Sequence, residues 1–224
     1  MVRARLKKVL CLVLTVAMVF SMSFTASAAD KTPGSISNLF STVQNAVLKC
    51  VLSQKNFITK EIVRSQFRTA AAGGAALGCT TAANFLNHSL QNRPSDLVYA
   101  PSSQYAVQLL KSEEGKQIIK DFKAQSAGKS SCTISGDVAL NSTPDLYLAY
   151  NEVSYTASGV KTGDTWVLTI TFKDRYDFAA KDWSSTLSAQ SVVTVINNYA
   201  VYAQTLDAIE NYDISVTARI SYKA

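Results

Sequence analysis

Residues 212–222 decide the fold, and they read Tyr212-Asp213-Ile214-Ser215-Val216-Thr217-Ala218-Arg219-Ile220-Ser221-Tyr222. Apolar and polar side chains alternate along this stretch. Ile214, Val216, Ala218 and Ile220 share one face, whereas Ser215, Thr217, Arg219 and Ser221 share the other. A period of two residues is typical of a β-strand with one face on the core and one face in water. The stretch therefore predicts a half-buried antiparallel sheet.

The preceding part of the chain, from about residue 128 onward, has the same character, because β-branched and aromatic residues become frequent there. The segment Lys161-Thr162-Gly163-Asp164 is typical of the turn of a β-hairpin. A helix is predicted from about Leu187 to Ile209, and we expect it to pack across the sheet. Further strands are predicted at Cys132–Ile134, Leu146–Tyr155 and Thr165–Phe172.

The chain before residue 128 shows the helical period instead, with apolar residues three and four positions apart. Ser112 is a candidate N-cap, since Glu113 and Glu114 would occupy the first turn of its helix. The sequence thus predicts an α+β fold, in which a helical region at 30–127 precedes a β-rich domain at 128–224. That domain is expected to be a twisted antiparallel sheet or partial barrel with one covering helix. Helices are predicted at Ser35–Gln54, from Thr59, from Thr80, at Ser103–Leu110 and at Ser112–Gln125.

The first 29 residues are predicted to be a signal peptide. Four basic residues precede an apolar stretch from Val9 to about Phe24, and Ala26-Ser27-Ala28 supplies a cleavage-like pattern before Asp30. The apolar stretch is shorter than the roughly 20 residues that a membrane-spanning helix needs. We expect an extracellular, secreted bacterial protein that is not an integral membrane protein after cleavage.

Removal of that leader changes the charge. The formal net charge of +6 includes its four basic residues, Arg3, Arg5, Lys7 and Lys8, so the remaining chain is close to neutral. Its basic residues are interspersed with acidic ones, and a nucleic-acid partner is not expected.

The remaining cysteines are Cys50, Cys79 and Cys132. They are too few for a disulfide scaffold in a chain of this length. Two alternatives stay open, namely three small buried thiols or one bridge between Cys50 and Cys79. His88 is the single histidine, which leaves little room for a histidine-rich metal site.

The segment Asp174-Arg175-Tyr176-Asp177-Phe178 is the most informative polar group, and the sequence places it just after a strand. Two carboxylates three residues apart are suited to general acid–base work or to holding a hard cation. The same residues are also suited to a capping turn in which Arg175 neutralises the carboxylates.

Asp174-x-Tyr176-Asp177 resembles the D-x-Y-D motif of colicin M-type bacteriocins, and Tyr176-Asp177-Phe178 resembles toxin-like domains of polymorphic secreted proteins. The resemblance implies hydrolysis of a lipid-linked cell-wall precursor at its pyrophosphate, with a divalent cation such as Mg²⁺ or Ca²⁺. Asp177 would then be the essential carboxylate, with Asp174 and Tyr176 in support. The family's following His-Arg pair is replaced here by Lys181-Asp182-Trp183-Ser184. Arg175, Asn197 and Asn198 are therefore the candidate substrate-binding residues.

Two functions follow from these patterns. The first is a non-catalytic extracellular protein without a cofactor, whose partner is a protein or a component of the cell envelope. The second is a toxin- or bacteriocin-like hydrolase of an envelope pyrophosphate. The single histidine and the absence of a nucleophile motif favour the first.

Overall fold

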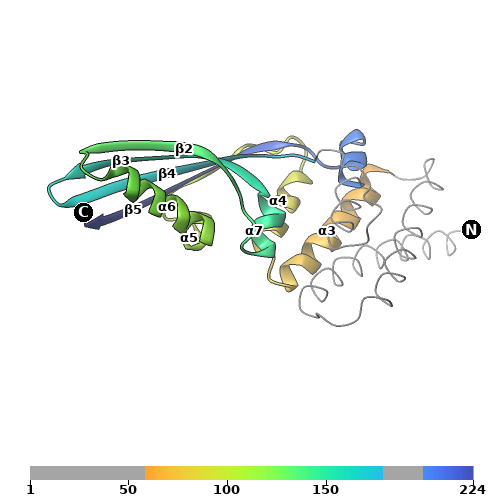
Figure 1. Cartoon of the computed structure of the whole chain (residues 1–224). Helices are drawn as coiled ribbons and strands as arrows, with labels where there is room; N and C mark the ends of the chain where they lie inside the picture. The colour runs from red at the N-terminus through yellow and green to blue at the C-terminus, as the bar shows by residue number, and fades with distance from the viewer. Residues whose placement is uncertain (1–58, 179–198, 224) are drawn as a thin grey trace, which may run out of the picture. The chain divides into compact units, whose positions relative to one another are not determined.

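The computed structural model describes residues 59–178 and 199–223 (Figure 1). The chain divides into two compact units, and each contains segments that are distant in the sequence. The helical unit contains described residues 59–93, 177–178 and 199–210, and the sheet unit contains 94–176 and 211–223. The predicted boundary near residue 128 is not a boundary between these units.

The sheet unit is built on an open, mixed sheet of five strands in the order β1-β5-β4-β3-β2. β2 to β5 are antiparallel, as expected, and the short β1 adds a parallel edge beside β5. The predicted α+β class is confirmed, and the sheet is not closed into a barrel. The strands are β1 (Leu97–Tyr99), β2 (Ser131–Ala139), β3 (Glu152–Thr162), β4 (Thr165–Tyr176) and β5 (Tyr212–Lys223).

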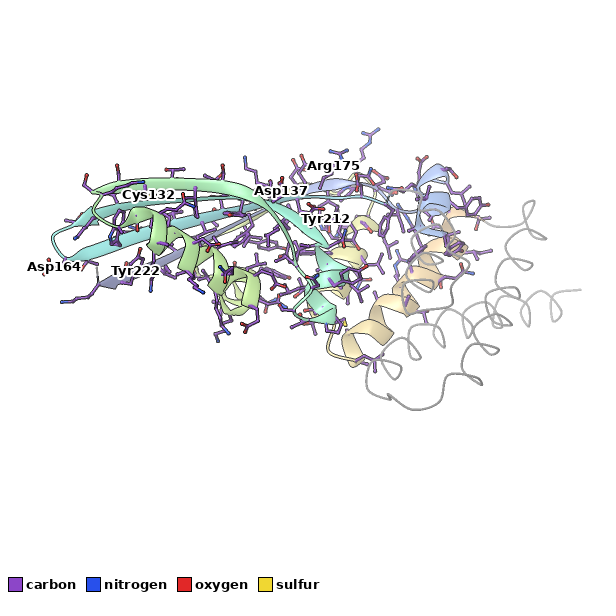
Figure 2. All side chains as sticks on the ribbon, in the orientation of Figure 1. Cys132, Asp137, Asp164, Arg175, Tyr212 and Tyr222 are labelled. Carbon is purple, nitrogen blue, oxygen red and sulfur yellow. The ribbon has the colours of Figure 1, made fainter. Side chains whose placement is uncertain are left out.

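The alternation predicted for β5 is confirmed. Ile214, Val216 and Ala218 are buried on what we call the inner face, whereas Arg219 and Ser221 are exposed on the outer face. The predicted hairpin joins β3 to β4, with Gly163 at a φ of 59° and Asp164 at its tip (Figure 2). A positive φ is accessible to glycine at no steric cost, which explains the residue at this turn.

Two helices, α5 (Gln104–Lys111) and α6 (Glu113–Ser126), cover the inner face. Both begin at a predicted position, because the Ser103 hydroxyl accepts from Ala106 N and the Ser112 hydroxyl from Gly115 N. Phe122 of α6 lies directly over Gly159 of β3, where a Cβ would be 2.5 Å from the ring. The Phe122 ring also packs edge-on against Trp166, with the two ring centroids 5.6 Å apart. The sheet core is therefore sealed by α5 and α6.

The predicted strand Leu146–Tyr155 is wrong in its first half. Helix α7 occupies Pro144–Ala149, and β3 starts only at Glu152. The Thr143 side chain accepts from Leu146 N, and Pro144 occupies the first turn. Proline is favoured at the first helical position because it has no N–H to satisfy there. This local start signal outweighs the strand propensity of the apolar and aromatic residues that follow.

The helical unit packs α3 (Lys60–Ala76) and α4 (Thr80–Ser89) against residues 199–209. Val63, Phe67, Leu86 and Ala203 are buried in one cluster. Residues 199–205 are helical and belong to the helix predicted at Leu187–Ile209, whose earlier part lies outside the described residues. Residues 199–209 thus pack with α3 and α4 within the helical unit, and the expected contact of this helix with the sheet stays a prediction.

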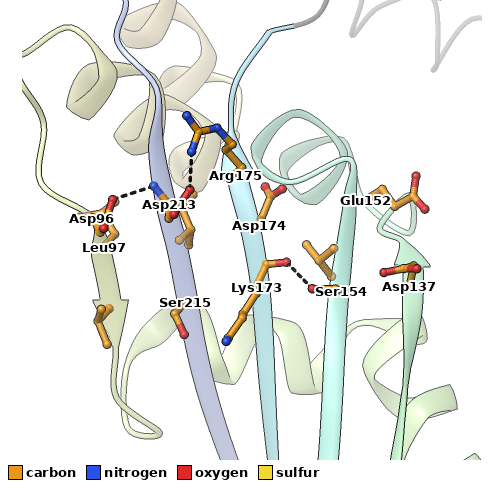
Figure 3. Close-up of a pocket in the computed structure, with 13 residues that line it drawn as sticks. Asp96, Leu97, Asp137, Glu152, Ser154, Lys173, Asp174, Arg175, Asp213 and Ser215 are labelled. Carbon is orange, nitrogen blue, oxygen red and sulfur yellow. Dashed lines mark hydrogen bonds and ion pairs between the residues drawn. The ribbon is translucent and has the colours of Figure 1, made fainter.

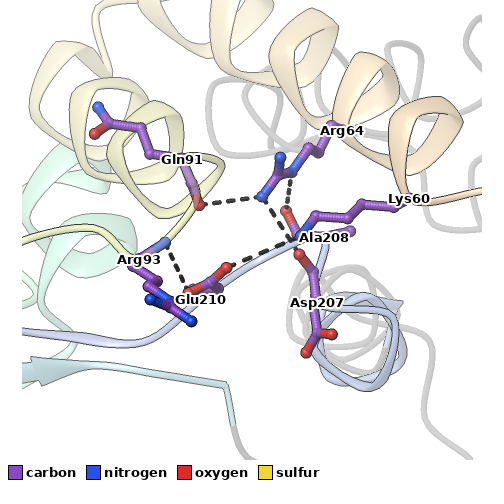
Figure 4. A network of polar contacts seen from close by, with 7 residues as sticks. All are labelled: Lys60, Arg64, Gln91, Arg93, Asp207, Ala208 and Glu210. Carbon is purple, nitrogen blue, oxygen red and sulfur yellow. Dashed lines mark hydrogen bonds and ion pairs between the residues drawn. The ribbon is translucent and has the colours of Figure 1, made fainter.

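Arg64 on α3 is a buried charged residue, only 4% exposed, and its hydrogen bonds connect three segments of the helical unit (Figure 4). Its Nε donates to Ala208 O at 3.1 Å, and its Nη2 donates to Gln91 O at 3.1 Å and to Asp207 O at 3.4 Å. These carbonyls lie just after α4 and just after the 199–205 helix. A planar guanidinium suits this role because it offers several donors in a fixed fork.

Glu114 on α6 ties that helix to the loop after β2. Its carboxylate accepts from Asn141 N, Ser142 N and the Ser142 hydroxyl at 2.9, 2.7 and 2.6 Å. Partial burial alone would raise the pKa of Glu114, but these hydrogen bonds outweigh it and hold the pKa below its usual value.

We expect Glu114→Gln to lower the free energy of unfolding by about 1 kcal/mol at pH 7, because charge-assisted hydrogen bonds are lost. A depressed carboxylate pKa stabilises the fold above the unfolded value and ceases to do so as the pH falls through the folded value. The difference between wild type and variant should therefore begin to shrink as the pH falls below the ordinary glutamate value of about 4.3, and should vanish once the pH is below the lowered pKa of Glu114. Urea unfolding across this pH range measures it. Glu113→Gln is the control, since the Glu113 side chain is 76% exposed, and an equal loss there would contradict the assignment.

Gly115 permits the close approach of α5 and α6. A Cβ at this position would be 1.9 Å from the carbonyl oxygen of Leu109. We expect Gly115→Ala to destabilise the protein by about 2–3 kcal/mol, since the backbone must shift. In helix α3, no neighbouring group of the described residues lies within 4 Å of the position that a Cβ at Gly73 would take, so Gly73→Ala should stabilise by about 0.5–1 kcal/mol. Thermal unfolding followed by circular dichroism measures both signs, and a stabilising Gly115→Ala would contradict the packing.

Candidate functional site

The predicted site residues do not come together on one surface. β4 continues through Tyr176, so the expectation that the strand ends before Asp174 is wrong. Because side chains alternate along a strand, Asp174 and Tyr176 lie on the inner face and Arg175 on the outer face. Asp177 is exposed directly after β4 and belongs to the helical unit. Asn197 and Asn198 lie outside the described residues.

Tyr176 is part of the core of the sheet unit. It pairs directly with Tyr212 across β4 and β5, and the two rings stack with centroids 5.2 Å apart. Burial, followed by the charge of Asp174, raises the pKa of the Tyr176 phenol above its ordinary value. The phenol stays protonated at neutral pH and is not suited to act as a general base.

Further tyrosines surround Asp174 on the inner face. Burial is the main cause that raises the pKa of Tyr150 and of Tyr212, and the Asp174 carboxylate adds to both effects. Tyr99 and Tyr105 lie next to each other with ring centroids 4.1 Å apart. We call this group the tyrosine cluster; its members are Tyr99, Tyr105, Tyr150, Tyr176 and Tyr212. They are scattered over more than a hundred positions of the sequence, so no local motif announces them.

A second polar group lies on the outer face, in an open depression of about 620 Å³ (Figure 3). Arg175 Nη1 and Asp213 Oδ1 are 3.1 Å apart there, on directly opposed positions of β4 and β5. Asp96 Oδ1 accepts from the backbone N–H of Asp213 at 3.0 Å. Lys173, Ser154 and Asp137 follow in register across β4, β3 and β2.

The depression is lined by five acidic residues and two basic ones, but Asp174 directs its side chain to the inner face, so four acidic side chains remain for the depression itself. Within the described part of the chain, Arg175 is engaged with Asp213, whereas the carboxylates of Asp137 and Glu152 form no ion pair or hydrogen bond. We call this site the acidic depression. Its charge favours cationic groups, with the screening that applies to exposed charges. The acidic residues that line it are Asp96, Asp137, Glu152, Asp174 and Asp213.

The sequence patterns identify Asp174 and Arg175 but miss the other residues of the acidic depression. Asp137 and Glu152 are isolated acids at the end of β2 and the start of β3. Only the register of the sheet brings them onto one face. Asp213 carries a usable signal, since it begins the alternating stretch on which the sheet is predicted.

No family model, curated protein or solved structure matches this chain. Within residues 59–178 and 199–223, no group of three or more His, Cys, Asp or Glu is arranged to hold a metal ion. No helix in these ranges is long and apolar enough to cross a membrane. Cys132 is a free, half-buried thiol; Cys79 is buried, and Cys50 lies outside the described residues, so the Cys50–Cys79 bridge stays a prediction.

The tyrosine cluster predicts a loss of stability at alkaline pH. The unfolded phenols ionise near pH 10 and the folded ones only above it, so stability is fully present below about pH 10 and falls as the pH rises further. Asp174→Asn removes one cause of the raised pKa values. We expect tyrosinate absorbance to appear at lower pH in this variant than in wild type, as measured by spectrophotometric titration. Asp121→Asn on α6 should leave the titration unchanged; an equal shift there would contradict the role of Asp174.

Proposed function

We propose that this chain is a secreted, non-catalytic binding protein, and that the acidic depression binds a basic segment of a protein partner. The observation that carries the proposal is the pair Asp137 and Glu152. Their carboxylates lie on the outer face of neighbouring strands, line an open depression, and are not neutralised by a described basic residue.

The sheet holds these charges in fixed positions. Asp137 is opposite Ser154 on β3, which is opposite Lys173 on β4. Neighbouring strands are about 4.8 Å apart, so a lysine or arginine side chain entering the depression meets carboxylates from more than one strand. Lys173 and Arg175 on the same face repel cationic groups. They therefore restrict the positions in which a basic segment can bind and fix its orientation.

The affinity that such a site supplies is modest. Exposed ion pairs contribute about 0.2–1 kcal/mol each and are screened by salt. A few such ion pairs alone give only weak binding. Dissociation constants between the millimolar and the micromolar range require a partner that adds further contacts. We therefore infer a protein partner with a basic segment rather than an isolated small cation.

The same charges bear on the hydrolase alternative. A pyrophosphate is anionic, and a depression lined by the carboxylates of Asp96, Asp137, Glu152 and Asp213 disfavours it without added cations. Tyr176 lies in the core of the sheet unit, and Arg175 faces away from Asp174 and Tyr176. These positions favour a structural role for Asp174 and Tyr176 and support binding over hydrolysis.

Fluorescence anisotropy with residues 30–224 tests the proposal. The probe is a labelled extended peptide in which lysine alternates with serine, and the control peptide carries glutamate in place of lysine. We expect only the basic peptide to bind, with an affinity that falls at least about tenfold between low and moderate salt. The double variant Asp137→Asn/Glu152→Gln should weaken binding by about 2- to 30-fold, which corresponds to the loss of two exposed ion pairs.

Glu113→Gln/Asp121→Asn is the matched control, because it removes the same charge from the solvent side of α6. Equal binding by both double variants would refute the proposed site. An assay with the lipid-linked precursor and Mg²⁺ completes the test. Product that depends on Asp177, as judged by Asp177→Ala, would refute the non-catalytic assignment.

A further inference from the structure

Strand β2 lies at one edge of the sheet. Its hydrogen bonds show which of its residues direct their backbone N–H and C=O groups away from β3. Leu140 N donates to Asn151 O at 2.7 Å, and Lys161 N donates to Ser130 O at 2.8 Å, so even-numbered residues pair with β3. In an antiparallel ladder the intervening residues direct their N–H and C=O groups away from that neighbour. All of these outward residues are exposed, and they are Ser131, Thr133, Ser135, Asp137 and Ala139.

This edge lacks the features that keep sheet edges from pairing. β2 runs for nine residues from Ser131 to Ala139 and contains no lysine, arginine or proline, and Asp137 is its only charged residue. The opposite edge, β1, is only three residues long. Natural edges are blunted by short strands, by inward charges and by proline. Among the strands that the structure describes, β2 is therefore the long edge that is open to another strand.

We propose that β2 pairs with β2 of a second copy of this chain, antiparallel and across a two-fold axis at Ser135. In this register every outward residue of one copy faces an outward residue of the other, which allows about ten backbone hydrogen bonds. The two sheets become one continuous sheet. This inference rests on the edge and does not depend on the proposed function.

The strand is complementary to itself in this register. On the outer face Thr133 is opposite Asp137 of the second copy, so the two like charges are not opposed. On the inner face the bulky Ile134 is opposite Gly136 of the second copy, and Cys132 is opposite Val138. Like charges that are directly opposed destabilise a strand pair, and this register opposes none; it also opposes no two bulky side chains on the inner face. The β2 edge is thus complementary to β2 of a second copy of the chain, and we infer that this copy is its partner.

Sedimentation velocity of residues 30–224, from about 1 to 200 µM, tests the pairing. We expect a reversible monomer–dimer equilibrium. Ser135→Pro removes an outward N–H from both copies while leaving the β2–β3 hydrogen bonds intact, and should raise the dissociation constant at least about tenfold. Ser135→Lys places two like charges in direct opposition and should act in the same direction.

Ser158→Lys is the matched control, because Ser158 lies on the same outer face but on the interior strand β3. It should leave the dimer unchanged. Far-ultraviolet circular dichroism checks folding, and if Ser135→Pro unfolds, Ser135→Lys decides the question. A protein that stays monomeric over the whole range, or a dimer that Ser135→Lys does not weaken, would overturn the proposal.

Disulfide trapping tests the register. In a Cys50→Ser/Cys132→Ser background, Ser135→Cys places the two thiols on opposed residues about 5.5 Å apart at Cα, which suits a disulfide. Thr133→Cys places them several residues apart along the strand. We expect a covalent dimer on oxidation for Ser135→Cys and none for Thr133→Cys, and the reverse result would refute the two-fold axis at Ser135.

Discussion

The antiparallel register between β4 and β5 is the constraint on which the sheet unit depends. It opposes Tyr176 to Tyr212 and Arg175 to Asp213 in consecutive rows. Because consecutive side chains leave opposite faces, this one register buries the stacked tyrosines and exposes the ion pair. A slip by one residue would move a charged pair into the core and the tyrosines into water. The cost of that exchange keeps the aromatic core and the acidic depression on separate faces.

The elements that the sequence predicts correctly are those whose signals are local. The alternation in β5, the N-cap at Ser112 and the helix start at Ser103 each depend on signals within a few residues, and all three are found in the structure. The end of β4 is different. The charged run Lys173-Asp174-Arg175 marks a strand end by composition, but β5 continues beside it and supplies the hydrogen-bond partners that extend the strand. Tertiary pairing outweighs local propensity there.

Long-range organisation explains the remaining differences. Residues 199–209 carry an apolar stripe that would fit a sheet as well as a helix pair, and only the burial of Ala203 with Val63 and Leu86 shows which surface it meets. Asp137 and Glu152 are likewise single acids without a motif. Their proximity follows from the β2–β3 register, which an amphipathic pattern within either strand does not specify. Sequence periodicity identifies a face, whereas a site requires knowledge of which faces meet.

The two proposals support each other physically, although they rest on separate observations. Pairing at β2 by a two-fold axis keeps both outer faces on the same side of the continuous sheet, so the two acidic depressions would face the same way. Exposed ion pairs give one depression a weak hold on a basic segment. A partner with two such segments would bind the second site at a high effective concentration, which raises avidity without any new contact. The small hydroxyl side chains on the outer face between the depressions favour this arrangement, because they leave room for a partner that spans both. These side chains belong to Thr133, Ser135, Thr156 and Ser158.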